Sequence, residues 1–371
     1  MIQKNPKIMK DTYYNKIVVL ILIFCFGYAL KAQEEVSKII EKSYDLTNVG
    51  ELQLENKYGN ININGWDQNK IQIKINVIVN KKEKEYAQDL LNRIKPSISY
   101  SKEFISIFSY IEEKENGFFS KLLNRANPFD FDKGNIQINY DINLPINAEV
   151  QITNKFGDIF TNGWNGKLNT NIGHGNIWIQ DNLTNASIEM KFGKLKAKSI
   201  AYGSIKIKNS ELDIENSKNL SLNSSGSTIA LKNISNLEIY SSKDKVTIRQ
   251  VDKIRGELKF SNMILEEVSE NIDLTMDVAD FNAYKITKSN ANIDIKQKSS
   301  EVHLNISDLN FYFNASLEQG LLRIPKSFTN INTTIIDKSK KLRNVTASYG
   351  NDTKGKIQIH GIKGVVILSE K

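Results

Sequence analysis

The sequence contains very little cysteine, proline or histidine. Its 371 residues include one cysteine, five prolines and three histidines. The single cysteine, Cys25, lies within an N-terminal apolar run, so the rest of the chain has no disulfide, thiolate metal site or cysteine nucleophile. Five prolines and twenty glycines are too few for a low-complexity chain, which favours a folded protein.

A strong excess of charge is also missing once the N-terminus is set aside. The whole chain has 50 basic and 42 acidic residues and a formal net charge of +8. Residues 1–32 hold five of the lysines and one aspartate, which leaves 45 basic and 41 acidic residues, or +4. No basic cluster is interleaved with aromatic residues, so the sequence does not predict nucleic-acid binding.

The N-terminus has the pattern of a signal peptide. Four lysines precede an apolar run of 14 residues, 17–30, which is short for a membrane span. We expect cleavage between Ala32 and Gln33 and export to the periplasm, the outer cell surface or the medium. An uncleaved anchor is one alternative, and a lipoprotein attached through Cys25 is another. No other long apolar stretch exists, so no membrane span is expected after signal removal.

A short unit recurs along the chain at a fixed spacing. FGDI (156–159) is followed by HGNI (174–177), and Gly157, Gly175 and Gly193 are each 18 residues apart. Apolar residues at alternate positions continue to residue 304, which is typical of half-buried strands. The pattern predicts an all-β fold. It favours a β-solenoid, similar to a parallel β-helix, with two short strands in each turn of about 18–20 residues.

The glycines of this unit have a conformational reason. A corner between short strands often needs a positive φ, which glycine adopts without cost and asparagine or aspartate adopts next most readily. Later corners are predicted where glycine has become rare, at 225–227, 243–245, 279–281 and 299–301.

The chain divides into four consecutive parts. These are a signal peptide, a β-rich part, the solenoid repeats and C-terminal strands that cap them, at 1–32, 33–150, 151–310 and 311–371. Within the second part we predict one short helix at 81–95, with Tyr86 on its apolar face. A surface loop is predicted at 112–134, where four phenylalanines either cover the core or form a contact surface.

The sequence offers few groups for catalysis. Asp277 and Asp280 flank a predicted corner, and Glu266 is adjacent to Glu267. Such paired acids could serve a polysaccharide-cleaving enzyme, but the sequence favours solvated corner residues. We predict no catalytic residue, no metal site and no cofactor. None of the histidines has a second histidine at metal-binding spacing; they are His174, His303 and His360.

The three tryptophans differ in their surroundings. Trp66 and Trp164 each follow Asn-Gly at equivalent places, which indicates a structural role. Trp178 lies between the inward residues Ile177 and Ile179, so its side chain should face outward. An outward tryptophan could stack on a sugar or lie beneath the predicted loop. Trp178 is therefore the one predicted binding residue.

The repeated units resemble a known family. YGNI (58–61) with Gly65-Trp66, and FGDI (156–159) with Gly163-Trp164, resemble the DUF4097 group. That group consists of exported β-strand-repeat candidate adhesins, common in Bacteroidetes and similar to the head domains of autotransporter-type adhesins. The resemblance covers roughly residues 48–310. It implies a β-solenoid in the cell envelope and brings no catalytic residues.

Three functions are consistent with these features. The first is an exported, non-enzymatic adhesin or surface protein that binds a glycan. The second is a periplasmic envelope component linked to envelope-stress sensing, whose partner is another envelope protein. The third is a polysaccharide-cleaving enzyme. The oligomeric state is not predicted by the sequence.

Overall fold

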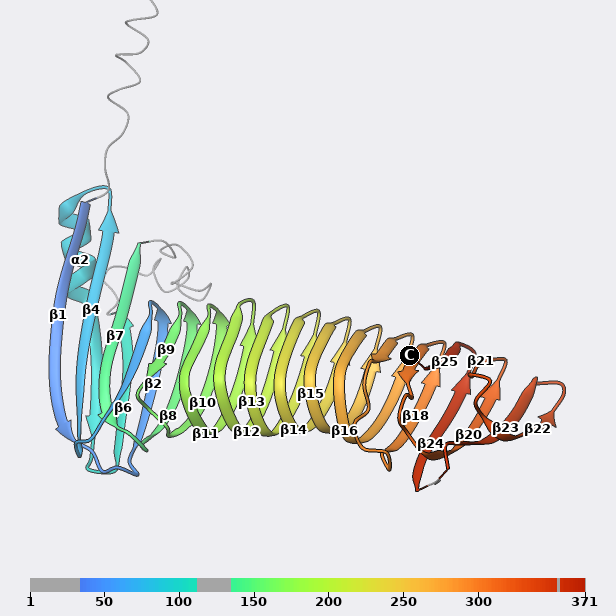
Figure 1. The fold of residues 1–371 in the computed structure, drawn as a ribbon. Coiled ribbons are helices and arrows are strands. Elements are labelled where there is room, and N and C mark those ends of the chain that lie inside the picture. The colour runs from blue at the N-terminus through green and yellow to red at the C-terminus, as the bar shows by residue number, and fades with distance from the viewer. Residues whose placement is uncertain (1–33, 112–134, 352–353, 371) are drawn as a thin grey trace, which may run out of the picture. The chain divides into compact units, whose positions relative to one another are not determined.

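The computed structural model describes residues 34–111, 135–351 and 354–370. The predicted cleavage site at Ala32 and Gln33 and the predicted loop 112–134 lie outside these residues. Among the described residues, strands dominate and α2 (Lys84–Arg93) is the one helix (Figure 1). The chain forms two compact units, each built from separate segments. The smaller comprises Met1–Lys38, Val77–Lys95 and Ile111–Gln137, and the larger comprises Ile39–Asn76, Pro96–Tyr110 and Ile138–Lys371.

The strands occur in chain order with short connections. The first ten are β1 (Glu34–Asp45), β2 (Glu51–Tyr58), β3 (Ile61–Trp66), β4 (Lys70–Lys81), β5 (Ile94–Tyr100), β6 (Phe104–Ile111), β7 (Ile136–Pro145), β8 (Glu149–Phe156), β9 (Ile159–Asn162) and β10 (Lys167–His174). The next nine are β11 (Ile177–Lys191), β12 (Lys194–Lys208), β13 (Glu211–Ser225), β14 (Thr228–Ser242), β15 (Lys245–Lys259), β16 (Asn262–Asp277), β17 (Asp280–Ala283), β18 (Asn292–Lys298) and β19 (Glu301–Asn305). The last six are β20 (Phe311–Glu318), β21 (Leu321–Arg323), β22 (Thr329–Asp337), β23 (Leu342–Tyr349), β24 (Gly355–Ile362) and β25 (Val365–Ser369).

The helix is shorter than predicted. It begins three residues later than the expected start at 81 and ends two residues before 95. Its buried stripe consists of Ala87, Leu90 and Leu91, at spacings of three and four residues. Tyr86 is 60% exposed, so its predicted place on the apolar face is wrong. It precedes Ala87 by one residue, and one residue turns a helix by about 100°.

The side chain of Lys38 caps the C-terminal end of α2. Lys38 Nζ donates hydrogen bonds to the carbonyl oxygens of Leu91 (2.7 Å) and Ile94 (2.6 Å). A cation at this end is stabilised by the exposed carbonyl groups of the last turn. Burial, and then repulsion from Lys95, lower the pKa of Lys38 from its ordinary value.

The larger unit contains a long, mostly parallel sheet. β12 to β15 have 15 residues each, and each is joined to the next strand by two residues. Each also pairs in parallel with the next. The partners are 17 residues apart from β12 to β15, as in Glu211 with Thr228 and Thr228 with Lys245, and the offset rises to 18 in the second half of the β15–β16 pairing. β10 to β16 thus lie side by side in chain order (Figure 1). An all-β fold with a long parallel sheet and one short helix is confirmed.

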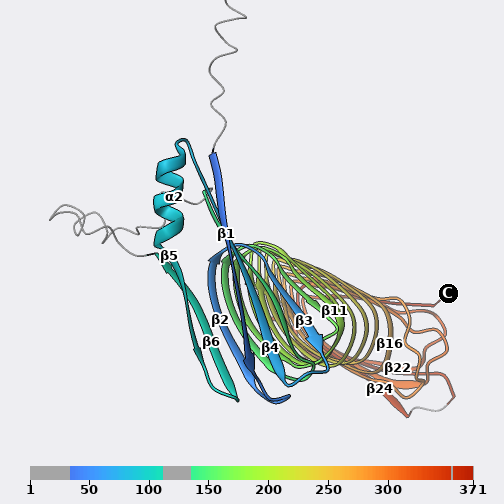
Figure 2. The ribbon, with the colours of Figure 1, turned by 90° about the vertical axis from the view of Figure 1, so that its left-hand side faces the viewer.

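The strands of this sheet are bent rather than straight. A two-residue connection cannot carry the chain back along a straight strand of 15 residues, so each strand must bend within its length. In β13 the bend falls where Lys218 and Asn219 are both exposed and the alternation of inward and outward residues breaks. Figure 2 shows bent paths of similar outline behind β2 and β3. The expected two short strands per repeat are therefore joined into one in this region.

Equivalent apolar residues form columns in the interior. In β12 to β16, the first inward position is buried in every strand, and its members are register partners. Burying such a column removes apolar surface that a single repeat could not cover alone. The first column contains Leu195, Leu212, Ile229, Val246 and Met263.

The repeated glycines form a column of their own. A Cβ atom on Gly157 would collide with the carbonyl oxygen of Gly59, and one on Gly175 with that of Gly157. The same holds for Gly193 against Gly175. Gly157 and Gly175 also have positive φ values of 126° and 151°. The 18-residue unit therefore keeps glycine both for its conformation and because backbones approach closely.

Later corners adopt positive φ without glycine. The expected preference for small polar residues is only partly met, since Phe192 (56°), Phe260 (53°) and Val278 (49°) are left-handed too. Because each of these residues occupies a two-residue connection set by the register of both flanking strands, the corner imposes the conformation. Such a φ is a strained state for a bulky residue, most of all for β-branched valine.

We expect Val278→Gly to stabilise the protein. Glycine relieves the backbone strain at this corner, and this gain outweighs the free-energy cost of glycine's greater entropy in the unfolded chain. The free energy of unfolding should therefore rise by about 1 kcal/mol. The midpoint of thermal unfolding should rise. Thr247→Gly, within β15 near its start, is the control and should lower the midpoint. A lower midpoint for Val278→Gly would contradict the assignment of strain to this corner.

Polar side chains beside the corners link neighbouring repeats, and we name them the corner ladder. In the early repeats the acceptor lies one repeat before the donor, as Asp158 Oδ1 accepts from the backbone N–H of Asn176 (2.8 Å). In the later repeats the acceptor lies one repeat after the donor. Ser227 Oγ accepts from Ser210 N (3.2 Å), and Asp244 Oδ1 accepts from Ser227 N (2.7 Å). The corner ladder thus satisfies backbone donors that the strands leave unpaired.

Candidate functional site

A groove of about 900 Å³ crosses the strands of the larger unit, and we name it the long groove. It is lined by equivalent positions of seven successive strands, from Lys167 in β10 to Asp273 in β16. With neighbouring strands about 4.8 Å apart, six strand-to-strand steps give a length of roughly 30 Å. An extended polymer fits this shape better than a compact small molecule does.

The long groove has two rows of side chains that flank a floor. The floor consists of inward residues of small or apolar type, of which Leu220 and Leu237 are buried. The first row lies at the bend of each strand and contains Asn185, Tyr202, Asn219, Asn236, Lys253 and Asn271. The second row contains Ser187, Ser204, Ser221, Glu238, Arg255 and Asp273.

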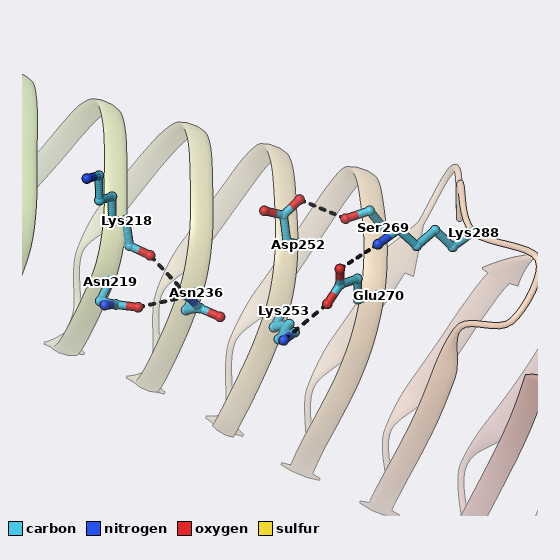
Figure 3. A network of polar contacts seen from close by, with 8 residues as sticks. All are labelled: Lys218, Asn219, Asn236, Asp252, Lys253, Ser269, Glu270 and Lys288. Carbon is cyan, nitrogen blue, oxygen red and sulfur yellow. Dashed lines mark hydrogen bonds and ion pairs between the residues drawn. The ribbon is translucent and has the colours of Figure 1, made fainter.

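Two neighbouring amide side chains of the first row, Asn219 and Asn236, are joined by a hydrogen bond. Asn236 Nδ2 donates to Asn219 Oδ1 (2.8 Å) and to the carbonyl oxygen of Lys218 (3.3 Å). Figure 3 shows Asn219, Asn236 and Lys253 along neighbouring strands. Such a ladder fixes the direction of each amide and repeats it at the strand spacing. The row can therefore offer regularly spaced hydrogen-bonding groups to a ligand that itself repeats.

The two ends of the long groove differ in charge. Around Ser187, Ser204 and Ser221 the second row carries only hydroxyl groups. Further along, Arg255 pairs with Glu238 (3.4 Å), so that end carries both signs of charge. The Arg255–Glu238 ion pair lies at the surface and contributes little to stability. Both charged groups are therefore available to a ligand.

The bend beside the charged end holds a small polar network (Figure 3). Lys253 and Lys288 both contact Glu270, and Asp252 accepts a hydrogen bond from Ser269 Oγ (2.7 Å). The hydrogen bonds from Lys288 and Lys253 lower the pKa of the Glu270 carboxyl from its ordinary value. Lys253 is thus anchored at one edge of the long groove.

One aromatic side chain lies in the long groove. Tyr202, in the first row between Asn185 and Asn219, is 46% exposed. The floor residue next to it is Gly203, which carries no side chain. An exposed tyrosine beside a shallow floor provides an apolar face and a hydroxyl for a sugar ring.

The predicted binding residue Trp178 lies elsewhere. Its neighbours Ile177 and Ile179 are buried, and the Trp178 ring stacks on Phe160 with centroids 6.5 Å apart and planes 6° apart. Trp178 does not line the long groove. It belongs to the outer face formed by the first part of each repeat, so its predicted contact with a sugar remains a prediction.

The other two tryptophans are not equivalent in the structure. Trp164 is completely buried, and its Nε1 donates to the carbonyl oxygen of Ala148 (2.9 Å). Trp66 is half-buried, and its Nε1 donates to the carbonyl oxygen of Lys70 (2.8 Å). Both indole N–H groups thus have backbone partners, which agrees with a structural role.

An aromatic column that sequence reasoning missed precedes the glycine column. The ring of Phe156 stacks on Tyr58 (5.4 Å between centroids) and on His174 (5.1 Å), and His174 stacks on Phe192 (4.9 Å). Each residue directly precedes a glycine of the repeat, which is the signal that could have revealed it. His174 is thus part of an aromatic stack.

The acidic residues singled out in the sequence do not form a cluster. Glu267 pairs with Lys285 (3.2 Å), and Asp280 is exposed. His303 Nε2 lies 2.6 Å from Glu301 Oε1 on an exposed surface. Within 34–111, 135–351 and 354–370, no group of three or more histidine, cysteine or acidic residues is placed to hold a metal ion.

A second feature missed in the sequence is the 17-residue spacing of asparagines. Asn219 and Asn236 are 17 residues apart, as are Asn216 and Asn233, whose amides are joined by a hydrogen bond of 3.0 Å. The 18-residue glycine spacing marks the early repeats, whereas the long groove lies mainly in the later repeats. In the described part of the chain, no helix has the length and apolar character needed to cross a membrane.

Comparison with known proteins gives distant structural likenesses only. No family model matches the chain, and none of the curated proteins matches it. A solved "putative adhesin" from Parabacteroides distasonis is 12% identical, with 90% of this chain and 97% of that chain covered and a TM-score of 0.31. A "putative adhesin" from Parabacteroides merdae is 15% identical, with 70% and 89% covered and a TM-score of 0.30. A "putative cell adhesion protein" from Clostridium sporogenes is 12% identical, with 92% and 100% covered and a TM-score of 0.18. Scores this low establish neither a shared fold nor a shared function.

Proposed function

We propose that this chain is an exported, non-enzymatic β-solenoid that binds an extended glycan of a cell surface along the long groove. The single observation that carries the proposal is the repetition of polar side chains along this groove at the strand spacing. A glycan repeats its hydroxyl groups along its length, so a row of amides and hydroxyls can contact it unit by unit.

The parallel register supports the solenoid. Strands that return to their own start after 17 residues, and stack on the next copy, form coils whose core is shared between neighbours. A rigid stack of this kind fixes the spacing of the first row without help from a ligand. Preorganised contacts lose less entropy on binding, which favours an open groove as a binding surface.

The adhesin function also agrees with the signal-peptide pattern and the family resemblance. The groups lining the long groove are suited to hydrogen bonding and stacking rather than to catalysis, because no two carboxylates there face each other across the groove floor as an acid–base pair. Trp178 is a second candidate contact, on the face where it stacks with Phe160.

Binding to a glycan array is expected to depend on the long groove. Tyr202→Ala should weaken binding of the best glycan about tenfold, or about 1.4 kcal/mol, because it removes the one aromatic face of the groove. The double variant Asn219→Ala, Asn236→Ala should weaken it at least as much. Titration of the purified chain with the glycan selected by the array measures both.

The matched control is Asn216→Ala with Asn233→Ala. These residues form the same kind of amide pair outside the long groove, so their loss should leave affinity unchanged. Intact binding by Tyr202→Ala together with lost binding by Trp178→Ala would move the site to the face of Trp178. Absence of binding to any surface glycan would overturn the proposal.

A further inference from the structure

The strand β22 has a free edge and two exposed faces. β22 pairs with β23 in antiparallel orientation. Among the described strands, β22 has no second pairing partner. Its residues are exposed from Thr329 to Ile336, including Ile331 (53%) and Ile335 (60%). Figure 1 shows β22 next to β23 at the C-terminal end of the larger unit. An exposed edge of this kind is a template for another strand.

The sequence of β22 has few features that protect an edge strand. TNINTTII (329–336) contains no charged residue and no proline, and it is rich in β-branched residues. The strand is interrupted only near its ends, by the left-handed Asn330 (52°) and by a register shift after Ile335. Between these two irregularities, Asn332–Ile335 pairs with β23 in unbroken register, and Ile331 lies within the register shift between Thr329 and Asn332.

We propose that two copies of this chain pair through β22, antiparallel and edge to edge, about a two-fold axis at Thr333. An antiparallel pair of identical strands is self-complementary, because residue i faces residue j and residue j faces residue i. With Thr333 on the axis, Ile331 lies opposite the partner's Ile335, and Ile335 lies opposite the partner's Ile331. The pairing joins two exposed isoleucine pairs and places no like charges opposite each other.

The even-numbered residues are also compatible with this register. Asn332 lies opposite Thr334 of the partner subunit, and Asn330 lies opposite Ile336 of the partner subunit, on the other face of the ribbon. The centre of the proposed register, residues 332–334, lies within the part of β22 that pairs regularly with β23. Because the paired run is short, the interface is small, and we expect a dimer that dissociates on dilution.

Introducing a charge at Thr333, on the proposed axis, tests the proposal. Sedimentation velocity over a range of concentrations should show a concentration-dependent dimer for the unmodified chain. Thr333→Lys and Thr333→Glu should each be monomeric at all concentrations, since each places two like charges opposite each other on the axis. An equal mixture of the two variants should form a heterodimer, because lysine then lies opposite glutamate.

The control is Leu321→Lys, which introduces the same charge at an exposed apolar residue of β21. It should dimerise like the unmodified chain. A monomeric unmodified chain would overturn the proposal, as would a dimer that persists in Thr333→Lys. Unchanged thermal unfolding of the variants shows that loss of the dimer does not come from unfolding.

Discussion

Gly175→Ala is expected to destabilise the protein by about 3 kcal/mol or more, or to prevent folding. A Cβ atom at this position would collide with the carbonyl oxygen of Gly157 and would lie 3.1 Å from Ile172 Cδ1. The carbonyl belongs to the backbone of the neighbouring repeat, so it cannot move without disturbing the parallel register. The φ of 151° adds conformational strain for any residue with a side chain.

Gly320→Ala is the control for this prediction. A Cβ atom there would have ordinary contacts, the nearest being Lys363 O at 3.5 Å and Gly364 O at 3.7 Å. It should leave the midpoint of thermal unfolding, followed by circular dichroism, almost unchanged. Equal effects of the two substitutions would show that close approach in the glycine column does not limit stability.

Asp244→Ala is expected to cost about 3–5 kcal/mol, because Asp244 is buried and connects three repeats of the corner ladder. Its Oδ2 accepts hydrogen bonds from the hydroxyls of Ser224 and Ser241 and from the N–H of Ser242 (3.0 Å). Its Oδ1 accepts from the N–H of Ser227 (2.7 Å). Alanine would leave the Ser224 hydroxyl and the N–H groups of Ser227 and Ser242 without this acceptor in a buried place, whereas Ser241 Oγ keeps Ser261 Oγ at 3.0 Å.

Two further variants sharpen this test. Asp244→Asn keeps the shape but puts an amide N–H₂ among donors, so it should also lower the unfolding midpoint. Asp252→Ala removes a half-buried carboxylate with one hydrogen bond, to Ser269 Oγ, and should cost no more than about 1 kcal/mol. Asp244→Asn as stable as the unmodified protein would contradict the described role of the carboxylate.

Most of the residues that alternation identified are buried in the structure; Phe260, which pairs with Leu258 in the same pattern, is instead 57% exposed at a corner. Ile177, Leu212 and Ile229 are inward because a strand with one buried face must alternate, and that rule needs no knowledge of the neighbouring strand. The spacing of Gly157, Gly175 and Gly193 likewise indicated the 18-residue register of the early repeats.

The candidate site was much less accessible to sequence reasoning. The long groove exists because Asn219 and Asn236 are register partners, and the register depends on the length of every bend between them. The left-handed conformation of Phe192 and Val278 is set by the same register against the preference of the residues themselves. The prediction that Trp178 binds a ligand rests on its residue type and outward direction. Neither property shows which side chains lie beside it.

The uniform 17-residue register from β12 to β15 makes the length of this part of the protein adjustable. Removing Glu211–Ser227 would bring Thr228 to the place of its own register partner, Glu211, and Asp244 to the place of Ser227. The side chains of Ser227 and Asp244 each accept a hydrogen bond from a backbone N–H of the preceding corner. The corner ladder would therefore continue across the junction. Gain or loss of whole repeats can therefore lengthen or shorten the long groove in steps of about 4.8 Å. A lineage could match its reach to ligands of different size without inventing a new contact.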